Sequence, residues 1–569
     1  MNRTLALALC SAVALSLPVT SSAQWSGNGV AASTAIGDQY TPTAISDGAG
    51  GIFVAWADSR NADLDIYAQH VNANGVVQWT SNGIVIRSAP KTQSDPRIIS
   101  DGAGGAIIAW VEQRNNNTLD IYAQRIDSAG LIQWTSTGVV VTSASNDQYN
   151  PNMTADGLGG AVITWEDARG GNPSDADVYT QRLSSAGAPL WTADGVAIST
   201  AANAQTYPTI TTDGSGGAII AWADSRNGID LGVYAQRIDA TGAVQWTAGG
   251  AAISATTGDQ NSPSLTADGA GGAFINWTDS RSGAIDIYGQ RVNSTGVVQW
   301  TANGVPICTA AYGQYDPRVI ADGSGGFFVT WIDERNTGTS DSDVFVQRVN
   351  SSGAAQWITD GVALNTASGS SVQARIILDG AGGAVVAWAD TRGGGLNYDI
   401  YAQRVNAAGV VQWTADGAAL CTATNGQLAP AIVPDGFGGA VVAWQDLRSN
   451  TTNDIYANRV SPGGAIPTGA GRTPAAAAAL IAGNGYPNPF SSGTAIDVNL
   501  REDAHVSMEV FDAAGHRVRV IDVGRIAAGA ARLDFDGRDA RARVLPSGVY
   551  FCRIHAGNDT VTRKLVIQR

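Results

Sequence analysis

Short apolar runs separated by glycine-rich turns follow one another along most of the chain, and the same arrangement returns eight times. Each copy can be aligned on an Asp-Gly turn, and successive turns lie 54 to 57 residues apart. The turns begin at Asp47, Asp101, Asp156, Asp213, Asp268, Asp322, Asp379 and Asp435. Repeats of this length that contain several short strands are typical of a propeller or another closed repeat array. The pattern therefore predicts an all-β fold.

Four strands fit inside each copy. In the first copy they are expected at 41–46, 52–58, 65–71 and 76–79, the last with an extension to 86. The turns at 47–51 and 72–75 contain Gly, Asp and Asn, which accept positive φ. An antiparallel four-stranded meander, equivalent to one propeller blade, is the simplest product.

The sixteen tryptophans occupy only two positions of the repeat. Eight lie in the second predicted strand, at Trp56, Trp110, Trp165, Trp222, Trp277, Trp331, Trp388 and Trp444. Eight are assigned to the fourth, at Trp25, Trp79, Trp134, Trp191, Trp246, Trp300, Trp357 and Trp413. Trp25 completes the second set only if it belongs to the last copy, which otherwise lacks a fourth strand. We therefore predict that 24–33 closes an eight-bladed β-propeller by pairing with the third strand of copy eight, and that the indoles are core residues.

A Trp-x-Asp/Glu-x-Arg signature also recurs in every copy. Its members include Asp58 with Arg60, Asp224 with Arg226, Asp279 with Arg281, and Asp390 with Arg392. Side chains two residues apart on a strand point the same way, so each pair can bridge internally or reach a neighbouring blade. Repetition favours a structural role over a catalytic one, and exposed pairs of this kind contribute about 0.2 to 1 kcal/mol each.

In seven copies a Gln lies eight residues before the Asp-Gly turn, with Pro three residues after it. This segment and the loop between the second and third strands should share one face of the ring, and insertions such as 170–174 fall in that loop. Tyr40, Tyr149 and Tyr315 follow the Gln in three copies only. Because function concentrates in variable loops on a rigid scaffold, we predict that these tyrosines contact a ligand.

Net charge and residue types exclude several kinds of partner and of catalytic or metal site. The net charge of −15 argues against nucleic acid or an anionic membrane as a partner. His70 is the sole histidine of the repeats, so no His-based triad or zinc site can be assembled. Asp58, Asp63 and Asp65 could hold calcium, but the other copies do not keep the middle carboxylate. We predict no catalytic residue, metal or cofactor, although a carboxylate pair of glycosidase type stays open.

Four segments are expected along the chain. Residues 1–23 are predicted to be a signal peptide, with Arg3 ahead of an apolar run and small residues at its end. Residues 24–466 form the ring, and 467–485 form a linker rich in Pro, Gly and Ala. Residues 486–569 have the pattern of a small immunoglobulin-like β-sandwich.

Two resemblances add to these expectations. The repeats resemble sialidase-type bacterial propellers, although 46–50 is only similar to their Ser-x-Asp-x-Gly-x-x-Trp box. The C-terminal segment resembles the type IX secretion sorting domain and the related immunoglobulin-like domain of the flagellar hook-capping protein. This resemblance rests on YPNPF (486–490), LPSGVYF (545–551) and RKLVI (563–567). It implies export to the outer surface of a Gram-negative-type bacterium, with the secretion machinery as a partner. The alternative is a passive immunoglobulin-like module with no sorting role.

The sequence favours a secreted or surface-displayed monomer that acts as a binding or adhesion module for an extracellular glycan or protein. The alternative is an extracellular hydrolase that acts on glycans, because one fold hosts many functions. A single non-repeated acidic pair on the ring channel would favour the enzyme, whereas a uniform lining would favour binding.

Overall fold

The structure, a computed structural model, describes residues 25–114, 118–336, 341–395, 397–467, 480–486, 488, 490–500, 503–512, 516–527, 529–557 and 559–568. Strands dominate these residues, and the one helix among them is the short 3-10 helix η1 (Pro173–Asp175). The predicted all-β class is confirmed. The predicted signal peptide lies outside the described residues. Within the ranges given, no helix is long and apolar enough to cross a membrane.

Strands β1–β32 build eight four-stranded sheets. The first strands are β2 (Gln39–Ser46), β6 (Gln93–Ser100), β10 (Gln148–Ala155), β14 (Gln205–Thr212), β18 (Gln260–Ala267), β22 (Gln314–Ala321), β26 (Ser371–Leu378) and β30 (Gln427–Pro434). The second strands are β3 (Ile52–Asn61), β7 (Ala106–Gln113), β11 (Ala161–Asp167), β15 (Ala218–Asp224), β19 (Ala273–Asp279), β23 (Phe327–Asp333), β27 (Ala384–Asp390) and β31 (Ala440–Asp446).

The outer half of each sheet follows the same plan. The third strands are β4 (Asp63–Val71), β8 (Leu119–Ile126), β12 (Asp177–Leu183), β16 (Gly232–Ile238), β20 (Asp286–Val292), β24 (Asp343–Val349), β28 (Asp399–Val405) and β32 (Asp454–Val460). The fourth strands are β5 (Ile84–Arg87), β9 (Val139–Thr142), β13 (Val196–Ser199), β17 (Ala251–Ser254), β21 (Val305–Cys308), β25 (Val362–Ala363), β29 (Ala418–Cys421) and, for the last sheet, β1 (Val30–Ser33).

The fourth strands begin later than the sequence predicts. In the first copy the expected run at 76–79 makes only one bridge, at Val77, and β5 follows it. A second tight turn intervenes, because the Gly83 N–H donates to the Thr80 carbonyl at 3.0 Å. Trp79 and its counterparts therefore precede the fourth strand and do not belong to it.

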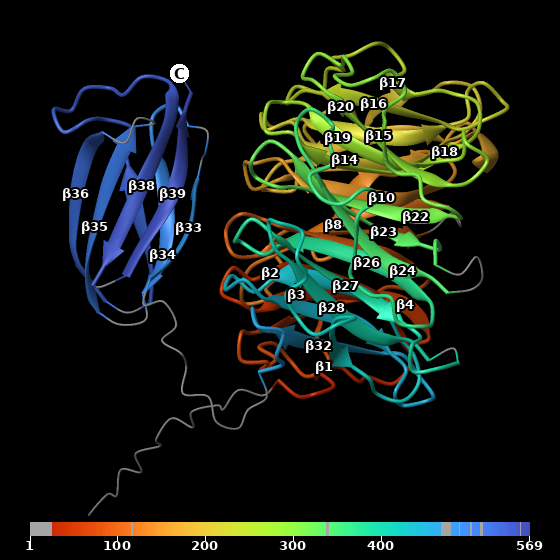
Figure 1. The fold of residues 1–569 in the computed structure, drawn as a ribbon, viewed down its shortest axis with the longest axis horizontal. Coiled ribbons are helices and arrows are strands. Elements are labelled where there is room, and N and C mark those ends of the chain that lie inside the picture. Colours follow the sequence, from red (N-terminus) through yellow and green to blue (C-terminus); the bar gives the residue numbers. More distant parts are fainter. Residues whose placement is uncertain are drawn as a thin grey trace, which may run out of the picture. The chain divides into compact units, whose positions relative to one another are not determined.

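The N-terminal strand completes the sheet of the last copy, where the strand order is β1-β32-β31-β30. Figure 1 shows β1 next to β32. Val30 pairs with Ala457. The side-chain oxygen of Asn28 accepts the Thr422 N–H at 3.0 Å, and its carbonyl accepts an Arg448 N–H at 2.7 Å. The predicted pairing of the N-terminal segment with the third strand of copy eight is confirmed.

The chain divides into two compact units, one comprising 1–96, 278–288 and 306–469 and the other 97–277, 289–305 and 470–569. In the first unit, β22, β26, β30 and β2 pack side by side in that order. The sheet that contains β1 thus lies between the sheets of copies seven and one. In the second unit, β10, β14 and β18 pack in order, and β7 and β8 pack against β10.

Apolar side chains fill the spaces between neighbouring sheets. Trp25, Ile52, Trp56, Val441 and Ile455 share one cluster, which joins the last sheet to the first. Tryptophans of the second strands have no exposed surface, and Trp25 is 2% exposed. The predicted core role is confirmed for these indoles, whereas four of the second set are half-buried. Those four are Trp79, Trp134, Trp300 and Trp357.

The C-terminal part contains two sheets that share one apolar core. Its strands are β33 (Leu480–Tyr486), β34 (Thr494–Leu500), β35 (Ala504–Asp512), β36 (Arg517–Ile526), β37 (Gly529–Phe535), β38 (Gly548–Ala556) and β39 (Asp559–Ile567). Their orders are β33-β34-β37 and β36-β35-β38-β39. Because β33 pairs with β34, the predicted linker, 467–485, extends too far at its C-terminal end.

Candidate functional site

The Trp-x-Asp/Glu-x-Arg signature forms a buried polar network in every sheet where it is described. In the first sheet, the Trp56 indole donates to Asp58 at 2.8 Å, and Arg60 binds both oxygens of the same carboxylate. The Arg60 guanidinium also lies 3.7 Å from the Tyr67 ring centroid and donates to the Asn82 carbonyl at 2.8 Å. The Arg60 side chain therefore links the second and third strands to the turn that precedes the fourth.

The structure brings together every pair that the sequence singled out. Arg226 lies 2.5 Å from Asp224 and Arg392 lies 2.6 Å from Asp390, while Arg281 and Asp279 are in equally close contact. The prediction that these ion pairs are exposed is wrong, because their carboxylates are buried. Removing one member of a buried pair leaves an uncompensated charge, which typically costs about 3 to 5 kcal/mol, well above the value for exposed pairs.

A second set of ion pairs was missed from the sequence. In seven copies, the Asp of the Asp-Gly turn accepts hydrogen bonds from an Arg on the third strand. These pairs are Asp101 with Arg125, Asp156 with Arg182, Asp213 with Arg237, Asp268 with Arg291, Asp322 with Arg348, Asp379 with Arg404, and Asp435 with Arg459. His70 takes this place in the first copy, 2.8 Å from Asp47. The sequence pattern that could have predicted these ion pairs is the Gln-Arg dipeptide that recurs in the third strands. Repeated eight times, this set too is scaffold.

The variable chemistry lies one residue beyond the predicted tyrosines, at the third position of each first strand. All eight residues there adopt left-handed φ between 50° and 57°, and none of them is glycine. They are Thr41, Asp95, Asn150, Tyr207, Ser262, Asp316, Gln373 and Ala429. Each is exposed or half-buried. We call this set the left-handed row.

A break in strand pairing produces this conformation. In the first sheet Tyr40 pairs with Ala57 and Thr43 with Ala55, which leaves Thr41 in a bulge before a proline. Left-handed backbone costs a residue with a Cβ about 1 to 2 kcal/mol. The row therefore holds different side chains in one shared, strained geometry.

A buried acid lies beside this row in the second unit. Glu166 on β11 is 3% exposed, and its Oε1 accepts the Asn150 side-chain N–H and the Tyr207 backbone N–H, both at 2.8 Å. Burial raises the pKa of Glu166 despite these two hydrogen bonds, which lower it. Oε2 has no hydrogen-bond partner among the described residues. Other copies have uncharged residues here, namely Ala57, Val111, Ala223, Thr278, Ile332, Ala389 and Gln445.

A second non-repeated cluster lies in the first unit. Asp316 of the row pairs with Arg318 at 2.6 Å and with Arg375 on the next first strand at 3.6 Å. The Tyr315 hydroxyl donates to Glu334 at 3.4 Å, and burial together with the Glu334 charge raises the pKa of Tyr315. Charged and aromatic groups thus gather at the start of β22.

The three predicted tyrosines lie immediately before row residues, and all are half-buried. Burial and the adjacent Asp38 raise the pKa of Tyr40. Burial first, and then the Glu166 charge, raise the pKa of Tyr149. Tyr149 and Tyr315 therefore belong to the two clusters above. The sequence signal for the row itself was the changing residue directly before the repeated proline.

The predicted sharing of one face by two loops is confirmed in the first sheet. Gln39 pairs with Asp58, and the Ser59 N–H donates to the Asp38 carbonyl at 2.9 Å. The left-handed row and the loop after the second strand therefore lie at the same end of the sheet.

The carboxylates considered for calcium are engaged separately. Asp58 is held by Arg60, whereas Asp65 accepts the Asn61 side-chain N–H at 2.8 Å. Asp63 accepts the Lys91 N–H at 3.0 Å. Among the described residues, no group of three or more His, Cys, Asp or Glu side chains is placed to hold a metal ion.

Comparison with protein families concerns the C-terminal part. Residues 486–560 match the model described as FlgD Ig-like domain. This supports the predicted immunoglobulin-like sandwich. No curated protein gave a match.

Solved structures give distant likenesses. A mutant of a puromycin hydrolase, in complex with a ligand, has 12% identity and a TM-score of 0.41, and the alignment covers 84% of this chain and 61% of that one. A polysaccharide lyase of family PL25, an ulvan lyase, has 10% identity and a TM-score of 0.41, with 76% and 96% covered. FlgD from P. aeruginosa has 24% identity and a TM-score of 0.13, with 15% and 67% covered. Likeness at this level assigns neither activity nor substrate.

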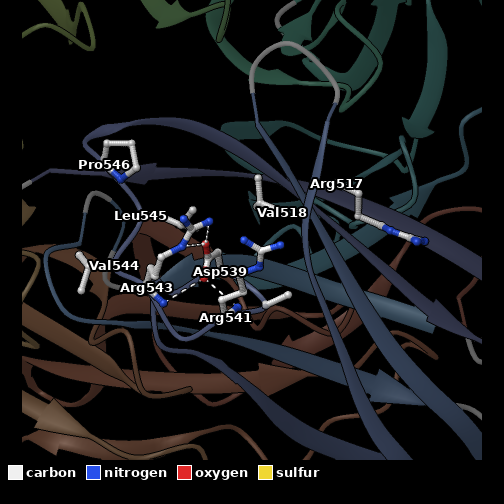
Figure 2. Close-up of a pocket in the computed structure, with 9 residues that line it drawn as sticks. Arg517, Val518, Asp539, Arg541, Arg543, Val544, Leu545 and Pro546 are labelled. Atoms are coloured by element: carbon white, nitrogen blue, oxygen red, sulfur yellow. Dashed lines mark hydrogen bonds and ion pairs between the residues drawn. The ribbon is translucent and has the colours of Figure 1, made fainter.

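The Ig-like domain contains a pocket of about 550 Å³ (Figure 2). It lies between the start of β36 and the segment 539–546, and its walls contain both charged and apolar side chains. Its lining residues are Arg517, Val518, Asp539, Ala540, Arg541, Arg543, Val544, Leu545 and Pro546.

Proposed function

We propose that this protein is a secreted or cell-surface β-propeller whose eight sheets form one closed ring, and that it acts as a binding or adhesion module. Closure is supported by contacts between the last copy and the first. The Trp25 indole and Arg459 both donate to the Ala73 carbonyl, at 2.9 and 3.2 Å. Elsewhere the equivalent Trp191 and Arg182 both donate to the Ala240 carbonyl. The junction between the ends thus matches one in mid-chain.

The left-handed row is the observation that carries the binding function. Strained non-glycine residues persist where the surrounding structure imposes them, and they cluster at functional sites. Here the backbone is constant while the side chain changes from copy to copy, including Tyr207, Asp316 and Gln373. Within the first unit the row carries hydroxyl, carboxylate and amide groups, and within the second unit it carries amide, aromatic and hydroxyl groups. Each set suits a ligand with many hydroxyl or amide groups, that is, a glycan or an extended protein segment.

A glycan array probed with the intact protein tests this proposal. Tyr207→Ala and Asp316→Ala should each reduce binding, because both side chains lie in the row. Leu158→Ala is the matched control, since Leu158 is 68% exposed in the turn at the opposite end of its sheet. Equal binding by all three variants would contradict the assignment of the row as the binding surface.

Export is the second part of the proposal. The Ig-like domain would act as a type IX sorting signal that the secretion machinery recognises, and the propeller would reach the outer surface of a Gram-negative-type bacterium as a monomer. The sequence segments YPNPF, LPSGVYF and RKLVI support this assignment.

An extracellular glycan-acting hydrolase is the alternative, and Glu166 favours it. A general acid needs a carboxyl group whose pKa is raised, and burial provides that for Glu166. A glycosidase also needs a second carboxylate about 5 to 9.5 Å away. Release of reducing sugar from array-positive glycans, lost in Glu166→Gln while binding remains, would establish the hydrolase. Glycan binding without release of reducing sugar would establish the binding module.

A further inference from the structure

The pocket of the Ig-like domain is organised by one carboxylate. Asp539 Oδ1 accepts the backbone N–H groups of Arg541 and Arg543, at 2.8 and 2.9 Å. Its Oδ2 binds the Arg543 side chain at 2.7 Å. Arg519 donates to the Asp539 carbonyl at 2.9 Å and holds the segment against β36. The negative charge of Asp539 is therefore compensated by the Arg543 side chain and by two backbone N–H groups of the same loop.

The arginines of the pocket differ in what they bind. Arg517 pairs with Glu509 at 2.5 Å, and its side chain extends away from Asp539 (Figure 2). Arg543 is held by Asp539. Asp539 binds the backbone N–H of Arg541 and not its side chain. The exposed Arg541 guanidinium has no hydrogen-bond or ion-pair partner among the described residues. One full positive charge thus remains available at the wall of the pocket.

Charge is distributed unevenly along the chain. Residues 486–569 contain 12 Lys and Arg against 10 Asp and Glu, whereas residues 1–485 contain 22 against 39. An anion is therefore repelled by the repeats as a whole but not by the Ig-like domain. Guanidinium groups bind carboxylate, sulfate and phosphate through paired N–H donors in a planar fork.

Apolar side chains form the rest of the wall. Val544 is 48% exposed, while the adjacent Leu545 is buried. Val518 and Pro546 complete this side of the pocket. A bare inorganic ion would leave this surface uncovered, so the walls fit a charged group attached to a larger body.

We propose that this pocket is an oxyanion site, which binds a carboxylate, sulfate or phosphate group carried on a larger molecule, with Arg541 as its main contact. The site is independent of the left-handed row and of any glycan bound there.

Isothermal titration calorimetry on the full chain tests the site, with trigalacturonate, inorganic sulfate and inorganic phosphate as probes. Trigalacturonate should bind, and Arg541→Gln should weaken its binding about tenfold or more, because a charge-assisted hydrogen bond is lost. Arg525→Gln, an exposed arginine on β36 outside the pocket, should leave the affinity unchanged. Arg541→Lys keeps the charge without the planar fork and should fall between the two.

Thermal unfolding of each variant verifies that it is folded. Equal weakening by Arg541→Gln and Arg525→Gln would overturn the proposal, because it would indicate attraction to overall charge. Absence of binding by all three probes would overturn it as well. Equal affinity for free sulfate or phosphate, lost in Arg541→Gln, would support the oxyanion site and assign it to the free ion.

Discussion

Replacement of Trp25 by alanine tests whether the ends of the repeats form a junction equivalent to those in mid-chain. Trp25 is 2% exposed and Trp246, at the same position of another copy, is 8% exposed. Both indoles donate to a turn carbonyl of the next sheet, at 2.9 Å to Ala73 and 3.0 Å to Ser294. Both also pack against a glycine of that turn, where a Cβ would lie 2.9 Å from Trp25 or 2.6 Å from Trp246.

The expected loss follows from this burial. Truncation of a buried tryptophan to alanine costs about 3 to 5 kcal/mol, through lost transfer energy and the cavity left behind. If the repeats unfold cooperatively, an unfolding entropy of about 2.1 cal/mol/K per residue converts that cost into a fall of about 4 °C for the predicted ring. Trp25→Ala and Trp246→Ala should therefore lower the unfolding midpoint by similar amounts.

Calorimetric unfolding of the two variants beside the wild type provides the measurement. Chemical denaturation with fluorescence detection adds an independent value of the free energy. In an open array, repeats contact only their neighbours, so a change at one end leaves most of the stability intact. A large loss for Trp246→Ala with a negligible one for Trp25→Ala would refute the closed ring.

Three further predictions concern charge and domain structure. Burial, and then the Asp390 charge opposite it, raise the pKa of Asp399 to about 6, so its stabilising contribution is lost as pH rises through that value. Asp399→Asn should therefore raise the unfolding midpoint more at pH 8 than at pH 4. Hydrogen bonds lower the pKa of Asp239, so Asp239→Asn should lower the unfolding midpoint, and by more at pH 8 than at pH 4. Arg226→Met should cost about 3 to 5 kcal/mol in denaturant unfolding because it strands a buried carboxylate, whereas Arg318→Met at a half-exposed pair should cost no more than about 1 kcal/mol. Truncation after Ile466 should preserve a cooperative melt and abolish surface display in the native host; normal display would remove the sorting assignment.

The sequence identified the repeat, its turns and the displaced N-terminal strand, because each depends on local patterns that recur. It placed the fourth strands too early, since the turn that ends at Gly83 follows the tryptophan and interrupts the run. It also treated Asp58 as exposed, because coverage by Arg60 and Tyr67 arises from three strands and cannot be seen in one.

The ligand contacts predicted for three tyrosines stay a prediction, and the structure adds a second candidate set, the left-handed row, one residue further along each first strand. Tyr40, Tyr149 and Tyr315 were singled out for their variability, but the left-handed residues follow them. A bulge depends on how two strands register, which the pattern of one strand does not specify. Glu166 could have been found, because it is the one acidic residue at its position in eight aligned copies.

The N-terminal strand has a consequence for the timing of folding. Arg448 binds the carbonyl of Asn28 across 420 positions, and Asn458 binds that of Ser26 across 432. During synthesis, the segment that carries Trp25 emerges before the rest of the repeats, yet it acquires its partner strand only when β32 has followed. Contacts of such large sequence separation form slowly, because the entropy of closing a long loop is lost before the contacts contribute any stability. Within the repeats, the segment that carries Trp25 is therefore the last to become protected, and a protease present during folding would cut there first.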